Sequence, residues 1–244
     1  MDIVVKKLGI IVQAHMGSTR LPNKMLKDLC GKSVLGHVIS RLKRVQRADA
    51  LLIATSDLPE DDALARECQK YNTDIFRGSN NDVLSRFYHA AEAYKLTDVA
   101  RVCADNTLID WTVIDDEIAA YRTGKYQQVD ASENVPLGLG CEIFSFDMLK
   151  EAHEKANEHY QREHVTPYLN EHYALPYRPP YPNDYSKYRF TLDTEEDWKL
   201  IQNIYHTLYR EGEDITLDCV IALMEQNPYL FDINKDVHQK TVKE

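Results

Sequence analysis

Apolar residues in the N-terminal half of the chain gather in short runs, and segments with helical spacing of apolar positions separate these runs. The runs are typical of strands that are buried on both faces of a parallel sheet. Strands are predicted at residues 8–13, 50–54, 75–76 and 99–103. Helices are predicted at residues 34–45, 60–71 and 82–95. Strands that alternate with helices over short connections predict a doubly wound, Rossmann-like α/β sheet that is mostly parallel and flanked by helices.

The second half of the chain is less regular. Strands are predicted at residues 141–146 and 189–193, and helices at residues 112–122 and 217–226. The segment 160–188 contains seven tyrosines and five prolines, so it cannot form one long helix. It is expected to line a pocket, to cover a subunit interface or to pack as a surface loop.

Polar residues at the predicted helix starts indicate where those helices are capped. Ser33 and Asp147 each precede a helical pattern and are predicted N-caps. Thr194 is followed three residues later by Asp197, which is a capping-box pattern with the shorter acid. The other face of the first helix carries Arg41, Lys43 and Arg44, which form either a basic patch or, as we expect, a solvated face.

Composition narrows the class of protein. The chain of 244 residues is 43% hydrophobic and 28% charged, which is ordinary for a globular protein. A formal net charge of −10 argues against nucleic acid or an anionic membrane surface as the main partner. No long apolar run or signal-peptide pattern occurs, and the five cysteines form no Cys-x-x-Cys motif. These features predict a cytoplasmic protein with reduced thiols.

A small, polar loop follows the first predicted strand. It carries Gly17, Ser18, Arg20 and Lys24. Such a loop is either a solvated turn or a cradle for phosphate, built from backbone N–H groups and cations. The ends of the other parallel strands, at residues 55–57, 77–79 and 105, are expected at the same edge of the sheet, where ligands of such folds bind. This convergence favours phosphate binding.

Two acids complete the predicted site. Asp105 and Asp193 each follow an apolar run. Mg²⁺ bound to a nucleotide takes one or two carboxylates together with phosphate oxygens and water, and Arg20 and Lys24 provide charge for a triphosphate. A strand-end Asp is also common as a helix cap or turn residue, so both interpretations stay open at this point.

The motifs together resemble a known family. Residues 13–24 (Gln-Ala-His-Met-Gly-Ser-Thr-Arg-Leu-Pro-Asn-Lys) resemble the opening motif of the CMP-sugar synthetase superfamily, which includes the acylneuraminate and 3-deoxy-manno-octulosonate cytidylyltransferases. The similarity is particularly clear to the spore-coat polysaccharide cytidylyltransferase (SpsF-like) branch. It continues in family order through residues 54–57, 76–79, 82–88, 101–105, 108–110, 142–146, 162–168 and 191–197.

The resemblance implies a glycosyltransferase-A-type nucleotidyltransferase that joins CTP to an acidic or phosphorylated acceptor and releases pyrophosphate. It implies a single domain over residues 1–244, a subregion for acceptor binding and dimerisation at about 130–188, Mg²⁺ as cofactor, a homodimer and a place in surface polysaccharide or glycan biosynthesis. No dedicated general base is identifiable.

The resemblance also implies roles for individual residues, carried over by position. The catalytic residues would be Arg20, Lys24, Asp105 and Asp193, of which Asp105 and Asp193 would hold the metal. The nucleotide would be bound by Ala14, His15, Gly17, Ser18, Arg20, Lys24, Thr55, Ser56, Asp57, Arg77, Gly78 and Asp82. The acceptor would be bound by Glu142, Arg162, Glu163 and His164.

The chain departs from the family pattern near the site. His15 stands where the family usually has Arg, and Gly140 where an acid is common. Ala104 and the pair Asn106-Thr107 replace a Gly and a Cys-Pro pair on either side of the first metal Asp. These departures keep open an alternative, a non-catalytic nucleotide-binding or scaffold subunit of the same fold. A sugar-transferring enzyme of this fold is less favoured, because it would usually have an Asp-x-Asp motif after the metal strand.

Overall fold

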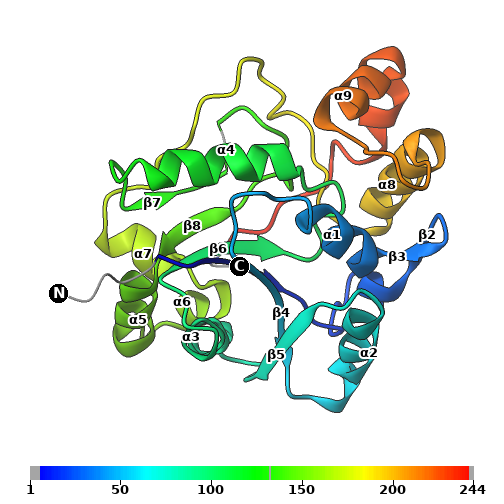
Figure 1. Cartoon of the computed structure of the whole chain (residues 1–244). Helices are drawn as coiled ribbons and strands as arrows, with labels where there is room; N and C mark the ends of the chain where they lie inside the picture. The colour runs from blue at the N-terminus through cyan, green and yellow to red at the C-terminus, as the bar shows by residue number, and fades with distance from the viewer. Residues whose placement is uncertain (1–5, 132, 242–244) are drawn as a thin grey trace.

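The computed structural model describes residues 6–131 and 133–241, and a six-stranded sheet lies at its centre (Figure 1). The strand order is β5-β4-β1-β6-β8-β7. These strands are β1 (Leu8–Gln13), β4 (Ala50–Ser56), β5 (Asp74–Gly78), β6 (Asp98–Cys103), β7 (Gln128–Val129) and β8 (Glu142–Ser145). A separate two-stranded hairpin consists of β2 (Asp28–Leu29) and β3 (Lys32–Ser33).

Most of the sheet is parallel, as the alternation of strands and helices predicts. β1 pairs in parallel with both β4 and β6, and β4 pairs in parallel with β5. β8 is antiparallel to its two neighbours, β6 and β7. The carboxyl ends of the four parallel strands therefore meet at one edge, which confirms the predicted fold class.

Helices cover both faces of the sheet. The α-helices are α1 (Val34–Leu42), α2 (Asp62–Lys70), α3 (Val83–Ala93), α4 (Trp111–Arg122), α5 (Phe146–Lys155), α6 (His159–His164), α7 (Pro167–His172), α8 (Glu195–Leu208) and α9 (Leu217–Gln226). The 3₁₀ helices are η1 (Lys24–Leu26), η2 (Pro59–Asp61) and η3 (Pro228–Ile233).

Three apolar cores result from this arrangement. One core joins one face of β1 to α1, α2 and α4, and another joins the opposite face to α3, α5 and α7. Leu8, Ile10 and Val12 belong to the first core, whereas Ile11 belongs to the second, as the alternation of side chains along a strand requires. A third core joins α8, α9 and η3 beside the sheet (Figure 1). It holds the chain that carries Asp193 against the sheet edge.

Two of the three predicted helix caps are confirmed. The Ser33 side chain accepts a hydrogen bond from the backbone N–H of Gly36 at the start of α1. Thr194 and Asp197 form the reciprocal capping box of α8. The prediction for Asp147 is wrong, because Ser145 caps α5 two residues earlier than the pattern suggested and Asp147 lies inside its first turn.

The predicted strand at residues 189–193 is also wrong. The segment is extended, but its only pairing within the described chain is an isolated bridge between Leu137 and Arg189. Its backbone instead bonds to two different loops: Phe190 N donates to Leu137 O, and Leu192 N donates to Asp105 O. The segment therefore crosses the sheet edge instead of joining it. Residues 160–188 contain parts of α6 and α7 and then irregular chain, which confirms that they do not form one helix.

None of the helices in residues 6–131 and 133–241 is long and apolar enough to cross a bilayer. All five cysteines are free thiols, as their spacing predicts.

Candidate functional site

The loop after β1 is fixed to the ends of its neighbouring strands by a buried carboxylate. Asp61, which is fully buried in η2, accepts a hydrogen bond of 2.7 Å from Met16 N in the loop. It also accepts hydrogen bonds from Thr55 Oγ1 at 2.9 Å and from Ser56 N and Oγ at the end of β4. Burial alone would raise the pKa of Asp61, but these hydrogen bonds outweigh burial and lower it. Asp61 is a positioning residue that the sequence did not single out.

Several residues predicted to border the nucleotide hold the loop after β1 and the neighbouring strand ends in place, and their polar groups bond to the protein itself. Thr55 and Ser56 are fully buried, and their hydroxyls are donated to Asp61. The Arg77 guanidinium pairs with Asp62 and donates to the carbonyls of residues 56 and 58. Asp57 and Gly78 meet through their backbones, since Asp57 N donates to Gly78 O. Direct contact of these residues with a nucleotide stays a prediction.

A cavity of about 400 Å³ opens beside the loop. It is lined by Gln13, His15, Gly17, Glu60, Asn80, Asn81, Val83, Arg86, His159 and Glu163. Burial, followed by the charge of Lys24, lowers the pKa of His15. The His15 ring is therefore neutral at pH 7, so it provides a hydrogen-bonding group where the family pattern has a fixed charge.

Arg86 is the main residue of this cavity that the sequence analysis did not predict to be functional. Its side chain in α3 is only 2% exposed, yet within the described chain its Nε has no hydrogen-bond partner. Nη1 donates to Ser79 O at 3.0 Å. Burial lowers the pKa of this guanidinium from its usual value. A buried cation with an unused donor at a cavity wall is the kind of group that an anionic or carbonyl-bearing ligand satisfies. The signal in the sequence is an arginine within an otherwise apolar helix face.

Lys24 brings the two predicted metal ligands together. Its Nζ lies 2.9 Å from Asp105 Oδ2 and 3.1 Å from Asp193 Oδ1, and it also donates to Leu192 O at 2.8 Å. Burial alone would lower the pKa of Lys24, but Asp105 and Asp193 outweigh burial and raise it. The predicted site residues Lys24, Asp105 and Asp193 thus converge at one point.

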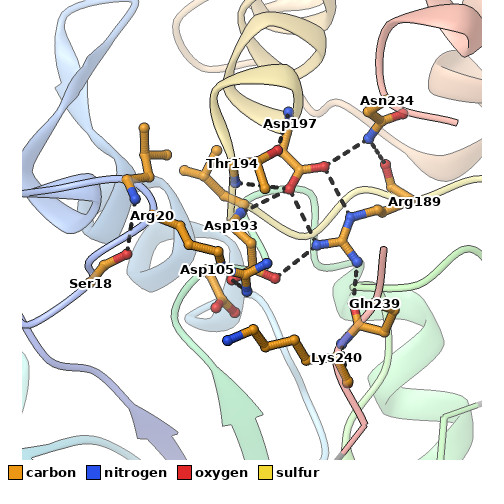
Figure 2. Close-up of polar contacts among 12 residues, drawn as sticks. Ser18, Arg20, Asp105, Arg189, Asp193, Thr194, Asp197, Asn234, Gln239 and Lys240 are labelled. Atoms are coloured by element: carbon orange, nitrogen blue, oxygen red, sulfur yellow. Dashed lines mark hydrogen bonds and ion pairs between the residues drawn. The ribbon is translucent and has the colours of Figure 1, made fainter. Parts of the chain in front are cut away.

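Two arginines complete this cluster around Asp193. Arg20 Nη2 lies 3.5 Å from Asp193 Oδ1, and Arg189 Nη2 lies 2.8 Å from Oδ2 (Figure 2). Arg189 also bonds to the fully buried Asp197, which holds its guanidinium in place. Burial alone would raise the pKa of Asp193, but Lys24, Arg20 and Arg189 lower it. Arg189 is a second residue of the site that the sequence analysis did not predict to be functional.

A glycine permits the approach of the segment that carries Asp193. Gly138 has a φ of +101°, which glycine adopts readily. A Cβ at this position would lie 3.0 Å from Thr191 N and 3.2 Å from Asn106 Oδ1. A side chain here would therefore push the Asp193 segment away from Asp105.

The two carboxylates suit Mg²⁺. Within residues 6–131 and 133–241 no group of three or more His, Cys, Asp or Glu side chains is arranged to hold a metal. Mg²⁺ at a nucleotide needs only one or two carboxylates, because phosphate oxygens and water supply the other ligands. Asp105 and Asp193, drawn together by Lys24, provide that donor set. The chemistry of the residues thus fits the predicted cofactor.

The predicted acceptor-side residues divide into two groups. Glu163 and His164 line a cavity of about 620 Å³ that also contains Asp105 and Asp193. Arg162 instead pairs with Asp82, with 2.8 Å between Nε and Oδ2, and donates to the carbonyls of residues 153 and 156. The structure therefore ties Asp82 and Arg162, predicted for different ligands, to each other.

Glu142, the fourth predicted acceptor-side residue, lines a second cavity and not the 620 Å³ cavity. It pairs with Arg101 and accepts a hydrogen bond of 2.7 Å from Thr166 Oγ1. The second cavity, of about 510 Å³, contains Arg101 and Glu142 together with the glycine loop and Arg178. Both cavities share Arg101 and Gly138, so they lie side by side.

The departure at Gly140 has a local explanation. A Cβ at this position would lie 2.5 Å from Glu117 Oε1. Glu117 is fully buried and accepts a hydrogen bond of 2.9 Å from Cys141 N. The carboxylate of α4 thus occupies the space that an acid at position 140 would need.

Comparison with known proteins identifies the family to which this chain belongs. A family model described as "Cytidylyltransferase" matches residues 9–233, from β1 to the end of η3. The chain belongs to the cytidylyltransferase family. An uncharacterized protein of Methanocaldococcus jannaschii is 37% identical to this cytidylyltransferase family member over 98% of the chain and 99% of its own length. The spore coat polysaccharide biosynthesis protein SpsF of Bacillus subtilis is 35% identical over 89% of the chain and 94% of its own length.

A solved structure agrees with this assignment. The structure of a cytidylyltransferase from Leptospira borgpetersenii is 27% identical and superposes with a TM-score of 0.86. The match covers 97% of the present cytidylyltransferase family member and 100% of the Leptospira chain. The resemblance that the motifs carry is therefore confirmed, and so is the nucleotidyltransferase fold.

Proposed function

We propose that this chain is a Mg²⁺-dependent enzyme that joins CTP to an acidic or phosphorylated acceptor and releases pyrophosphate. The observation that carries the proposal is Lys24, whose ammonium group is shared by Asp105 and Asp193 at the wall of the 620 Å³ cavity. The name of SpsF supports surface polysaccharide biosynthesis as the setting. The free thiols suit a reducing, cytoplasmic compartment, and we expect a homodimer built through residues 130–188.

The residues of the site match the demands of nucleotidyl transfer. An acceptor oxygen attacks the α-phosphorus of CTP in line, so that a new P–O bond forms as the bond to pyrophosphate breaks. This chemistry requires positioning and neutralisation of charge more than covalent participation by the protein. Arg20 and Lys24 provide cations for the triphosphate, and Arg86 provides a buried donor in the adjoining cavity. When bound at Asp105 and Asp193, Mg²⁺ would neutralise further phosphate charge.

Two groups in the acceptor cavity have protonation states that suit this role. Burial raises the pKa of the Cys103 thiol to about 11, so Cys103 stays protonated at pH 7 and is not a nucleophile. Burial lowers the pKa of His164, so its ring is neutral and accepts a hydrogen bond from an acceptor hydroxyl. Both residues line the cavity that contains Asp105.

The proposal is tested by pyrophosphate release from CTP with a panel of acidic sugars and phosphorylated alcohols. Activity should require Mg²⁺, and Asp105→Asn should lower it by about 100-fold, because the variant loses one of the two metal-binding carboxylates. Asp116→Asn is the matched control, since Asp116 is an exposed acid of α4. A 3-deoxy-manno-octulosonate cytidylyltransferase serves as positive control for the assay.

Two results would contradict the proposed function or the metal assignment. CTP binding without turnover on every acceptor, in an assay where the positive control is active, would contradict the proposal and favour the non-catalytic alternative. Equal activity of Asp105→Asn and the parent enzyme would contradict the metal assignment. The retained cluster of Lys24, Asp105 and Asp193 supports the catalytic role over that alternative.

A further inference from the structure

The described segment that follows η3 returns to the site and is attached there by polar contacts. Asn234, which is 4% exposed, donates through Nδ2 to Arg189 O at 3.0 Å and to Asp197 Oδ1 at 2.9 Å. Farther along, Gln239 Oε1 accepts a hydrogen bond from Arg189 Nη1 (Figure 2). Arg189 is the residue that also holds Asp193. The segment 234–241 therefore rests on the same framework as the metal-binding acid.

This attachment places Lys240 at the site. Gln239 and Lys240 line the 620 Å³ cavity together with Asp105 and Asp193. Lys240 also lines an adjoining cavity of about 500 Å³ that contains Arg20. Figure 2 shows the Lys240 side chain extending beside Asp105. The segment lies outside residues 9–233, so the family model does not include it.

The charges around Asp193 indicate that a further cation would strengthen the binding of a polyphosphate. Lys24 pairs with Asp105 and Asp193, Arg20 pairs with Asp193, and Arg189 pairs with Asp193 and Asp197. Three cations are thus balanced by three carboxylates, so the side chains of the cluster carry no net charge before Mg²⁺ binds, and a cation outside the cluster adds to the attraction that Arg20 and Lys24 exert on a polyphosphate. Within residues 6–131 and 133–241, the ion pairs of this cluster do not include Lys240, whose side chain lines the cavity.

We propose that Lys240 binds the phosphate chain of the nucleotide and that the segment 234–241 brings it over the cavity. The inference rests on the proposed function for the identity of the nucleotide. An ammonium group on a flexible stem suits the phosphate oxygens of CTP, which spread over several positions. The contact also covers one side of the cavity, which reduces access of water to the reacting phosphate.

Binding measurements on Lys240→Gln test this role directly. The probes are CTP with Mg²⁺ and inorganic tripolyphosphate, both measured by calorimetry without an acceptor. Loss of one charge-assisted contact should weaken both probes by about tenfold. Lys240→Arg should restore most of the affinity. Lys235→Gln is the matched control, because Lys235 lies on the same segment but pairs with the exposed Asp232, and it should bind both probes like the parent.

Steady-state kinetics separate a phosphate contact from other roles. In Lys240→Gln the KM for CTP should rise by about tenfold, whereas the KM for the acceptor and the melting temperature should stay unchanged. The affinity of the parent for CTP should also fall more steeply with salt than that of the variant. A change confined to the acceptor KM would overturn the assignment to the nucleotide.

The two probes keep this inference distinct from the proposed function. Equal CTP affinity in the parent and Lys240→Gln would overturn the role of Lys240 and leave the proposed function intact. A parent protein that binds tripolyphosphate through Lys240 but does not bind CTP would contradict the proposed function and leave the phosphate contact intact. Binding of neither probe by the parent would contradict both.

Discussion

At the scale of single residues, Arg86 is a buried side chain whose unused hydrogen-bond donor indicates a ligand-binding role. Burial of a charged group is costly unless partners compensate it. Arg86 is 98% buried, has one carbonyl partner through Nη1 and keeps Nε unused in the described structure. Its unused donor lies at the wall of the cavity that also contains His15. We therefore expect that this chain retains Arg86 for binding and not for stability.

Replacement of Arg86 by an apolar side chain should weaken CTP binding without lowering the stability of the folded protein. Arg86→Met should weaken CTP binding by about 10- to 100-fold, which corresponds to a charge-assisted hydrogen bond of about 1.5–3 kcal/mol. The melting temperature without nucleotide should stay the same or rise, because an apolar side chain of similar length replaces an incompletely paired cation. Calorimetry and thermal unfolding measure the two effects.

A surface arginine provides the control for this variant. Arg66→Met changes an exposed residue of α2 and should alter neither quantity by much. A lower melting temperature of Arg86→Met with unchanged CTP affinity would contradict the binding role and make Arg86 a structural residue.

At the scale of elements, the packing of α1 against α8 depends on a buried histidine. His37 in α1 packs edge-on against Tyr205 and Tyr209, and its Nε2 donates to Leu29 O at 2.6 Å. Burial lowers the pKa of His37 to about 4. The folded protein thus keeps His37 neutral at a pH where the unfolded chain, with its usual pKa of 6.5, binds a proton.

The sign of the pH dependence follows from this difference. Between about pH 6.5 and pH 4 the unfolded chain binds more protons than the folded one, so the free energy of unfolding falls as the pH falls. A difference of this size corresponds to about 3 kcal/mol at the low end of the window. His37→Gln should therefore lose much less stability than the parent between pH 7 and pH 4.5, as followed by chemical denaturation.

The exposed His206 in α8 provides the comparison. His206→Gln removes one histidine that is exposed instead of buried, and it should keep the pH dependence of the parent. An identical loss of stability in the parent and His37→Gln would show that another group is responsible for the acid sensitivity.

The sequence predicted elements better than it predicted the directions of side chains. Runs of apolar residues placed the four parallel strands correctly, because burial on both faces of a sheet demands such runs. The periodicity could not show that Arg41 is buried, where its guanidinium donates to the carbonyls of residues 108, 109 and 215. Those carbonyls come from distant parts of the chain, and only the tertiary structure brings them to α1.

In the site, too, the sequence indicated which residues belong together but not the directions of all their side chains. Lys24, Asp105 and Asp193 were predictable as site residues, because Asp105 follows a strand of the sheet and all three lie in short motifs, although the strand predicted before Asp193 is absent. The inward direction of Thr55 and Ser56 depends on Asp61, and the attachment of Arg189 depends on Asp197 and on Gln239, fifty residues farther along the chain. Such partners leave no local pattern in the sequence.

At the scale of the whole molecule, residues 130–188 are the part of the surface through which we expect two copies to meet. The outer edge of β7 is already covered, because Tyr177 N donates to Gln128 O and Asp130 N donates to Tyr177 O. Two copies therefore do not extend the sheet through this edge. Leu175, which precedes the covering residue by two positions, is 79% exposed, and Leu137 in the same subregion is 45% exposed. Leu137 also lines the two cavities of the site, so Leu175 is the side chain of this pair that we expect a second copy to cover.

A charge at Leu175 tests the predicted homodimer. Sedimentation of the parent should show a dimer, and Leu175→Asp should shift the protein towards the monomer, since burial of an unpaired carboxylate in each copy costs several kcal/mol in total. Tyr229→Asp is the control, because Tyr229 is 62% exposed in η3, outside residues 130–188, and should leave the dimer intact. A monomeric parent would contradict the dimer itself, whereas a dimeric Leu175→Asp would place the contact on another surface. Arg178 of the same subregion lines the 510 Å³ cavity beside the one that contains Asp105, so dissociation is also expected to raise the KM for the acceptor more than the KM for CTP.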